Sequence, residues 1–102
     1  MSVTVIASFE LADGRRNEFL VELARIVPAV LAEPGCLSYV PHIVGRDRVV
    51  VVESWESGDA LSAHAVAEPL TSFTKTVADL LASDMDVVVA RPIELSTLEV
   101  TR

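Results

Sequence analysis

The sequence predicts an α+β fold of the ferredoxin-like kind, a split βαβ sandwich with one antiparallel sheet. Hydrophobic periodicity gives the order strand, helix, strand, strand, helix, strand. The two middle strands are joined by a short, turn-rich connection, which is typical of a hairpin. At 102 residues, the chain is long enough for one core and too short for two. We therefore expect a single domain over residues 1–102, with residues 92–102 as an extended tail.

The first strand and the first helix are predicted by a change of period. Apolar and polar residues alternate over residues 3–11, as in a strand with one buried face. Asp13 and Gly14 break this strand, and Asp13 is a candidate helix cap. Apolar residues then recur at helical spacing up to Leu31. Pro28 lies inside that helix, where we expect a kink or a loosened turn.

The middle of the chain reads as a hairpin. Residues 36–42 form a short strand with Leu37 and Tyr39 on one face, and Pro41 suggests that its ladder ends there. A turn through Gly45 leads into residues 49–52, four valines in a row, which predict a strand buried on both faces.

The second half of the chain alternates helix and strand again. Ser57 is a good N-cap for a short helix that carries His64, and Pro69 suits the first turn of another helix. The last strand is predicted over residues 87–90, where apolar residues again occupy both faces.

Two strands with apolar residues on both faces require two covering layers. The helices of one chain can cover one face of a four-stranded sheet. A second copy of the same sheet is the cover we expect for the other face, which gives a homodimer that closes into an α/β barrel.

Composition narrows the class of partner. Half of the residues are hydrophobic, but no apolar run approaches the roughly 20 residues that span a bilayer, so we expect no membrane partner. The net charge is −7 with a single lysine, which argues against a nucleic-acid surface. The N-terminus has no secretory signal and Cys36 is the sole cysteine, so we expect a cytoplasmic protein.

Several short motifs carry a resemblance to a known family. They are Glu33-Pro34-Gly35-Cys36-Leu37-Ser38-Tyr39, and the run E-x-W-x-S-x-x-A-L-x-x-H from Glu53 to His64. On these residues the sequence resembles the antibiotic biosynthesis monooxygenase family over most of its length. The resemblance implies a dimeric α+β barrel, and oxygenation of quinols or aromatic polyketides with no flavin, haem or metal. We therefore expect no cofactor.

A haem-degrading branch of this family is disfavoured. That branch has an Asn on the first strand, where this sequence has Ala7 and Ser8. It also tends to place a Trp where His64 stands.

His64 is the candidate catalytic residue, because it is a titratable group on the apolar side of a helix. It could act as a base or orient a phenolic hydroxyl, since histidine ordinarily titrates near pH 6.5. The alternative is a structural histidine whose ring bonds a nearby carbonyl.

The candidate substrate-binding residues are aromatic or small and polar. Trp55 and Phe73 could stack on a flat substrate, or could simply be core or interface packing. The Tyr39 hydroxyl could bond a quinol, and Ser38 could anchor a substrate from a largely apolar strand.

Other chemistries are not indicated. Cys36 has no basic neighbour in the sequence that would activate a thiolate. Glu53 and Glu56 point to opposite sides of their strand, which argues against a paired-carboxylate site. His42 and His64 do not form a metal-binding spacing. No glycine-rich phosphate loop is present.

Two functional hypotheses remain from the sequence. The first is a cofactor-independent monooxygenase that oxidises a phenolic, quinol or polyketide-like aromatic substrate with O2. The second is a non-catalytic dimeric barrel that binds a small apolar metabolite. Both need a concave, mostly apolar site with a few polar groups, so the sequence does not separate them.

Overall fold

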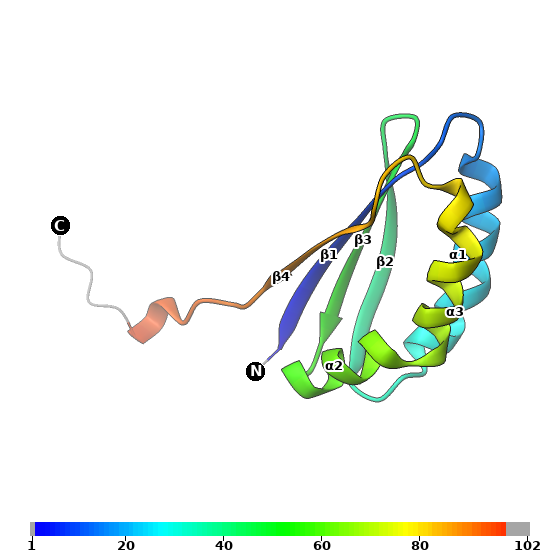
Figure 1. The fold of residues 1–102 in the computed structure, drawn as a ribbon. Helices are drawn as coiled ribbons and strands as arrows, with labels where there is room; N and C mark the ends of the chain where they lie inside the picture. Colours follow the sequence, from blue (N-terminus) through cyan, green and yellow to red (C-terminus); the bar gives the residue numbers. More distant parts are fainter. Residues whose placement is uncertain (1, 98–102) are drawn as a thin grey trace, which may run out of the picture.

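Four strands and three helices make up the computed structural model, which describes residues 2–97 (Figure 1). Their order is the predicted one, and the second helical region holds the two helices that Ser57 and Pro69 predict. The elements are β1 (Val3–Glu10), α1 (Arg16–Leu31), β2 (Cys36–Val44), β3 (Arg48–Trp55), α2 (Gly58–Val66), α3 (Glu68–Val77) and β4 (Asp86–Ala90), with 3-10 turns η1 (Ala78–Leu80) and η2 (Leu95–Thr97).

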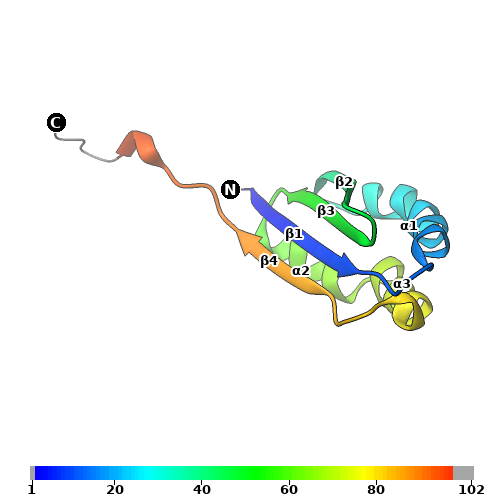
Figure 2. The same ribbon diagram turned by 90° about the horizontal axis from the view of Figure 1, so that it is seen from above.

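The strands form one antiparallel sheet in the order β2-β3-β1-β4. The helices lie on one side of this sheet, as Figure 1 shows, and the strand order can be followed from above in Figure 2. This is the ferredoxin-like α+β arrangement that the sequence predicts, with the expected hairpin between β2 and β3.

Strand period decides which residues face the helices. Val3, Val5, Ala7 and Phe9 of β1 are buried on that side, and their neighbours on β1 point to the other side. On β3, the same parity buries Val49, Val51, Glu53 and Trp55. Glu53 is therefore a charged residue placed on the buried face.

Three aromatic rings from three elements fill the core beneath the sheet. The ring centroid of Phe9 on β1 lies 5.0 Å from that of Phe19 on α1 and 6.1 Å from that of Phe73 on α3. Phe19 and Phe73 are 5.5 Å apart in an edge-on arrangement, which aromatic rings prefer. This cluster joins α1 and α3 to the sheet.

Strand β2 begins at Cys36 as predicted, but differs from the prediction at its C-terminal end and in the faces of Leu37 and Tyr39. It continues through Pro41 to Val44. β2 is an edge strand, and proline, which has no backbone N–H to donate, is tolerated on an edge strand where that group would face away from the sheet. The pairing with β3 shifts between Cys36 and Ser38, so Leu37 is not paired and is exposed while Tyr39 is buried.

The sequence predicts that Asp13, Ser57 and Pro69 each mark the start of a helix. Asp13 does not cap α1, whose N-cap is Arg15 without a side-chain bond. Ser57 caps α2 as predicted, with its Oγ accepting from the backbone N–H of Ala60 at 3.1 Å. Pro69 lies in the first turn of α3, also as predicted. Helix α1 runs through Pro28 to Leu31.

The sheet face away from the helices carries a row of apolar side chains. The strand registers align Val40, Val52, Ile6 and Val88 across all four strands. Each of the four is between 37% and 48% exposed in the single chain. The four-valine strand is therefore buried on one face only within one chain, through Val49 and Val51.

The chain leaves the sheet beyond β4 and extends away from its body (Figure 1). Ile93 and Leu95 in this segment are 76% and 65% exposed. The last part of the predicted tail, residues 98–102, lies outside the described residues.

Candidate active site

A cavity of about 260 Å³ lies between the helix-facing side of the sheet and helices α2 and α3. We call it the inner cavity. Its walls are apolar and include Val5, Ala7, Leu61, Leu70 and Val87.

The polar side chains on the inner cavity wall come from three elements. They are Tyr39 of β2, Glu53 of β3 and His64 of α2. A mostly apolar cavity with a few convergent polar groups is the usual form of a small-molecule site.

The cap of α2 fixes where His64 stands. Ser57 starts the helix, and His64 follows two turns later on the side that faces the sheet. The residue is 3% exposed. A histidine so deeply buried needs a partner for its polar ring atoms.

Glu33 provides that partner from the loop after α1. Its carboxylate oxygens lie 3.0 Å and 3.2 Å from Nδ1 of His64. An ionised carboxylate only accepts hydrogen bonds, so Glu33 bonds Nδ1 in the tautomer in which that nitrogen carries the proton.

Gly35 holds the Glu33 loop against α2. Its φ of +84° is in the left-handed region, and an added Cβ would stand 2.5 Å from the Cβ of Ala60. The backbone N–H of Glu56 donates to the Gly35 carbonyl at 2.8 Å. The loop is thereby tied to the end of β3.

Glu53 approaches the other nitrogen of the His64 ring. Its Oε1 is 3.8 Å from Nε2 and accepts a hydrogen bond of 3.0 Å from the indole N–H of Trp55. Burial raises the pKa of Glu53, while the bond from Trp55 and the proximity of His64 oppose that shift.

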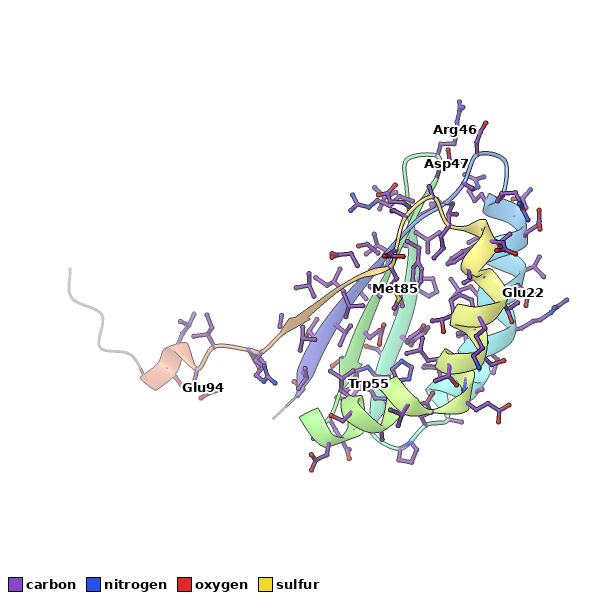
Figure 3. All side chains as sticks on the ribbon, viewed as in Figure 1. Glu22, Arg46, Asp47, Trp55, Met85 and Glu94 are labelled. Atoms are coloured by element: carbon purple, nitrogen blue, oxygen red, sulfur yellow. The ribbon has the colours of Figure 1, made fainter. Side chains whose placement is uncertain are left out.

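Trp55 is fully buried and stacks on the His64 ring, with centroids 4.4 Å apart and planes 29° apart. It is labelled in Figure 3 at the end of β3 near α2. It does not line the inner cavity. The side chain therefore supports His64 and Glu53 from behind.

Tyr39 contacts the same group from β2. Its ring lies edge-on to His64 at 6.2 Å between centroids. Burial, followed by the charges of Glu53 and Glu33, raises the pKa of the phenol. The hydroxyl is therefore a neutral group on the cavity wall.

The remaining predicted residues lie elsewhere. Phe73 belongs to the aromatic cluster with Phe9 and Phe19 and is 2% exposed. Ser38 pairs with Ser54, on the sheet face away from the helices. The structure brings together Tyr39, Trp55 and His64, and it does not bring Phe73 or Ser38 to the inner cavity.

A second hollow, the outer cleft, lies on the other side of His64. It has a volume of about 380 Å³ and is lined partly by the acidic residues Glu33, Glu56 and Asp59. His64 lines both the outer cleft and the inner cavity. Its ring therefore stands between an acidic, open side and an apolar, enclosed side.

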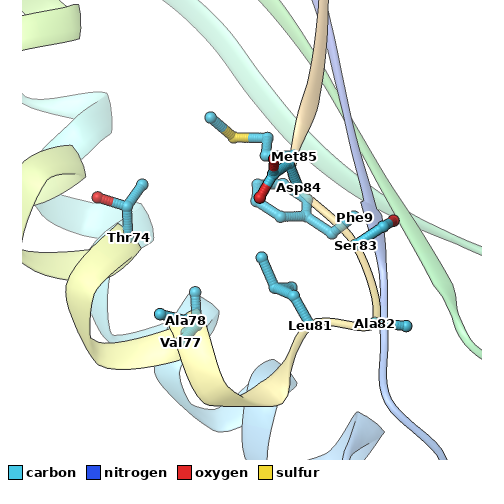
Figure 4. A pocket seen from close by; sticks show the side chains of 9 residues that line it. All are labelled: Phe9, Thr74, Val77, Ala78, Leu81, Ala82, Ser83, Asp84 and Met85. Atoms are coloured by element: carbon cyan, nitrogen blue, oxygen red, sulfur yellow. The ribbon is translucent and has the colours of Figure 1, made fainter.

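A further hollow of about 410 Å³ adjoins the inner cavity at the start of β4 (Figure 4). Met85 and Phe9 line both spaces. Figure 4 shows Met85 and Leu81 on opposite sides of this hollow, with Thr74 on α3 facing it. The Met85 side chain therefore stands at the boundary between the two spaces.

Two site residues, Glu53 and Glu33, escaped the sequence analysis. Glu53 shares its parity on β3 with Val49, Val51 and Trp55. That parity was a usable signal, because it places a carboxylate on the buried face. Glu33 begins the first of the two family motifs, but nothing in the sequence connects it with His64, which it meets across 31 positions.

No group of three or more His, Cys, Asp or Glu side chains within residues 2–97 is arranged to hold a metal ion. The same stretch contains no helix that is both long and apolar enough to cross a membrane.

Burial raises the pKa of the Cys36 thiol, and the neighbouring Glu33 adds to this shift, as expected for an unreactive cysteine.

Comparisons with known proteins extend these observations. The antibiotic biosynthesis monooxygenase family matches residues 2–76. A protein of Escherichia coli strain K12 named "Probable quinol monooxygenase YgiN" is 31% identical over 103 aligned positions, which cover 88% of this chain and 97% of the relative.

Solved structures give the same picture of the fold. Rv0793 from Mycobacterium tuberculosis is 26% identical with a TM-score of 0.85, covering 92% of this chain and 97% of its own. PA3566 from Pseudomonas aeruginosa is also 26% identical, with a TM-score of 0.80 over 90% of this chain and 94% of its own.

Proposed function

The chain belongs to the antibiotic biosynthesis monooxygenase family, and from this premise we propose that it oxygenates a phenol or hydroquinone with O2 and without a cofactor. The observation that carries the proposal is the meeting of Tyr39, Glu53 and His64 on the wall of an otherwise apolar cavity. An aromatic ring fits the apolar walls, and its hydroxyl requires polar partners of this kind.

The electrons in this scheme come from the substrate. One hydroquinone and one O2 give one hydroxyquinone and one water. The substrate loses four electrons, and these reduce both oxygen atoms. One oxygen enters the ring and the other leaves as water, so no external reductant is needed.

His64 is the base in this scheme. Its Nε2 takes the phenolic proton, and the resulting anion is the electron-rich form that reacts with O2. The proton then returns to the oxygen that leaves as water. A positioned base of this kind contributes on the order of 10² to 10⁴ in rate.

The other residues orient the substrate and exclude water. The neutral Tyr39 hydroxyl donates to a substrate oxygen, and Glu53 holds a hydroxyl against the His64 ring. Trp55 keeps that ring in place by stacking. Phe73 acts one layer further back, by packing against Phe9 on the cavity wall.

The active unit in this proposal is a homodimer of single-domain chains in the cytoplasm. The row formed by Ile6, Val40, Val52 and Val88 supports this, because a second sheet would cover it and close a barrel. The arrangement leaves the helix-side cavity of each chain intact.

Oxygen uptake tests the proposal directly. Purified protein is supplied with a panel of hydroquinones and anthrone-like phenols, and flavin, haem and metal are assayed in the same sample. We expect uptake of one O2 per substrate and no near-stoichiometric cofactor. Saturable binding of these ligands without uptake would instead favour the non-catalytic barrel.

A further inference from the structure

Two carboxylates compete for the single proton of a neutral His64 ring. Glu33 faces Nδ1 at 3.0 Å and 3.2 Å, and Glu53 faces Nε2 at 3.8 Å. A neutral imidazole carries one N–H, so it donates to one side and offers a lone pair to the other. The nitrogen that does not carry the proton is the one that can act as a base.

The contacts favour Glu33. Its two oxygens are both within hydrogen-bond distance of Nδ1, whereas the Glu53 oxygen is beyond such a distance from Nε2. Glu53 also already accepts the indole N–H of Trp55. Burial raises the pKa of Glu53, which makes its carboxylate the less favourable ionised partner.

The two sides of the ring open onto different spaces. Glu33 belongs to the outer cleft and does not line the inner cavity, while Glu53 lines the inner cavity and not the cleft. A ring that donates Nδ1–H outward keeps its Nε2 lone pair on the inner side, where Glu53 stands.

We infer that Glu33 is a positioning residue: its carboxylate fixes His64 in the tautomer protonated at Nδ1, so that Nε2 stays available as a base toward the inner cavity. When Nε2 takes a proton, the ring becomes an imidazolium flanked by Glu33 and Glu53. The proton is held there and returned, so the step leaves no net change in the protein. The kinetic part of this inference rests on the proposed function.

Glu33→Ala is the decisive variant. Without its outward partner, the ring gains by donating Nε2–H to Glu53, which turns the lone pair away from the cavity. We expect nitrogen-15 NMR of the resting protein, at a pH where the ring is neutral, to show the proton moved from Nδ1 to Nε2. The chain has two histidines, so a His42→Asn background assigns the signals.

Turnover of a hydroquinone gives the second measurement. We expect kcat of Glu33→Ala to fall by about 10² or more, because the wrong tautomer removes the base. KM should change little, because Glu33 does not line the inner cavity. Glu33→Asp should restore part of kcat. Glu56→Gln is the matched control, since Glu56 shares the outer cleft and should change neither measurement.

The outcomes separate this inference from the proposed function. An unchanged tautomer in Glu33→Ala, or a wild-type kcat, would overturn the positioning role. If Glu33→Ala does not fold, Glu33→Gln keeps the shape and an acceptor but removes the charge. Its kcat should then fall by roughly tenfold, since the imidazolium loses a charged partner, and a wild-type kcat would refute the inference. If the wild-type protein oxidises no phenol, the proposed function is wrong. The NMR measurement of the His64 tautomer would still test the positioning role of Glu33.

Discussion

His64 stands between carboxylates from two distant parts of the chain, and this setting makes its replacement informative. His64→Ala should lower oxygen-dependent turnover by about 10² or more if the ring is the base. If the ring is structural, His64→Ala should instead lower the free energy of unfolding by about 1–3 kcal/mol, as expected when buried partners lose a hydrogen bond. Oxygen uptake and thermal unfolding of the same variant distinguish the two.

The pH dependence of the wild-type rate is a companion measurement. The neutral ring is the base, so kcat/KM should rise with pH through the range in which histidine titrates, roughly pH 5 to 8. A flat profile over that range would count against His64 and move the proton acceptor to water or to the substrate.

Glu53 should make stability depend on pH. Burial raises the pKa of Glu53 above the ordinary value of 4.5, so this carboxyl binds its proton more tightly in the folded protein than in the unfolded chain. The contribution of Glu53 to the free energy of unfolding is fully present below pH 4.5 and is lost as pH rises through the raised pKa of the folded protein.

Glu53→Gln removes this titration. The variant should gain stability relative to wild type as pH increases above 4.5, and the gain should vanish below it. Urea unfolding at several pH values measures the difference. Glu56→Gln is an exposed control and should give a small, flat difference, whereas a flat difference for Glu53→Gln would contradict the buried-carboxyl account.

At the scale of elements, the tight loop between α1 and β2 sets the position of Glu33. Gly35→Ala should destabilise the protein by about 1–3 kcal/mol, through backbone strain and the clash with Ala60. Denaturant unfolding measures this loss. Oxygen uptake should also fall, because the displaced loop carries Glu33 away from His64.

Gly14 offers a matched control for that substitution. It has a φ of +76°, yet an added Cβ would meet nothing within 4 Å. Gly14→Ala therefore has the strain alone and should leave oxygen uptake unchanged. Equal losses of stability in the two variants would show that contact with α2 does not matter.

At the scale of the whole molecule, the apolar row on the open sheet face carries the dimer proposal. Wild-type protein should sediment as a dimer at micromolar concentration. Val52→Asp should dissociate it, because a charge would then be buried in the middle of the row. Val66→Asp is the control, since Val66 is 78% exposed on α2 and away from the sheet. A wild-type monomer would remove the proposal.

The sequence by itself determined the order of elements, the hairpin, the cap at Ser57 and the family. The elements, the hairpin and the cap depend on local period and turn chemistry, which neighbouring residues carry, whereas the family was indicated by the resemblance of two motifs. The prediction from sequence was wrong where tertiary context overrides local propensity. Pro41 was expected to end β2, and only the edge position of that strand explains why the ladder continues.

The tertiary structure alone decided the composition of the site. Tyr39, Glu53 and His64 share a cavity because β2, β3 and α2 meet there, and Glu33 reaches the ring because Gly35 packs its loop against α2. It also placed Trp55 behind the ring and Phe73 in the core, although the sequence offered both as aromatic residues that could stack on a substrate. The physical reason is that hydrophobic period fixes which face of an element is buried, whereas the contacts between elements depend on how those faces pack together.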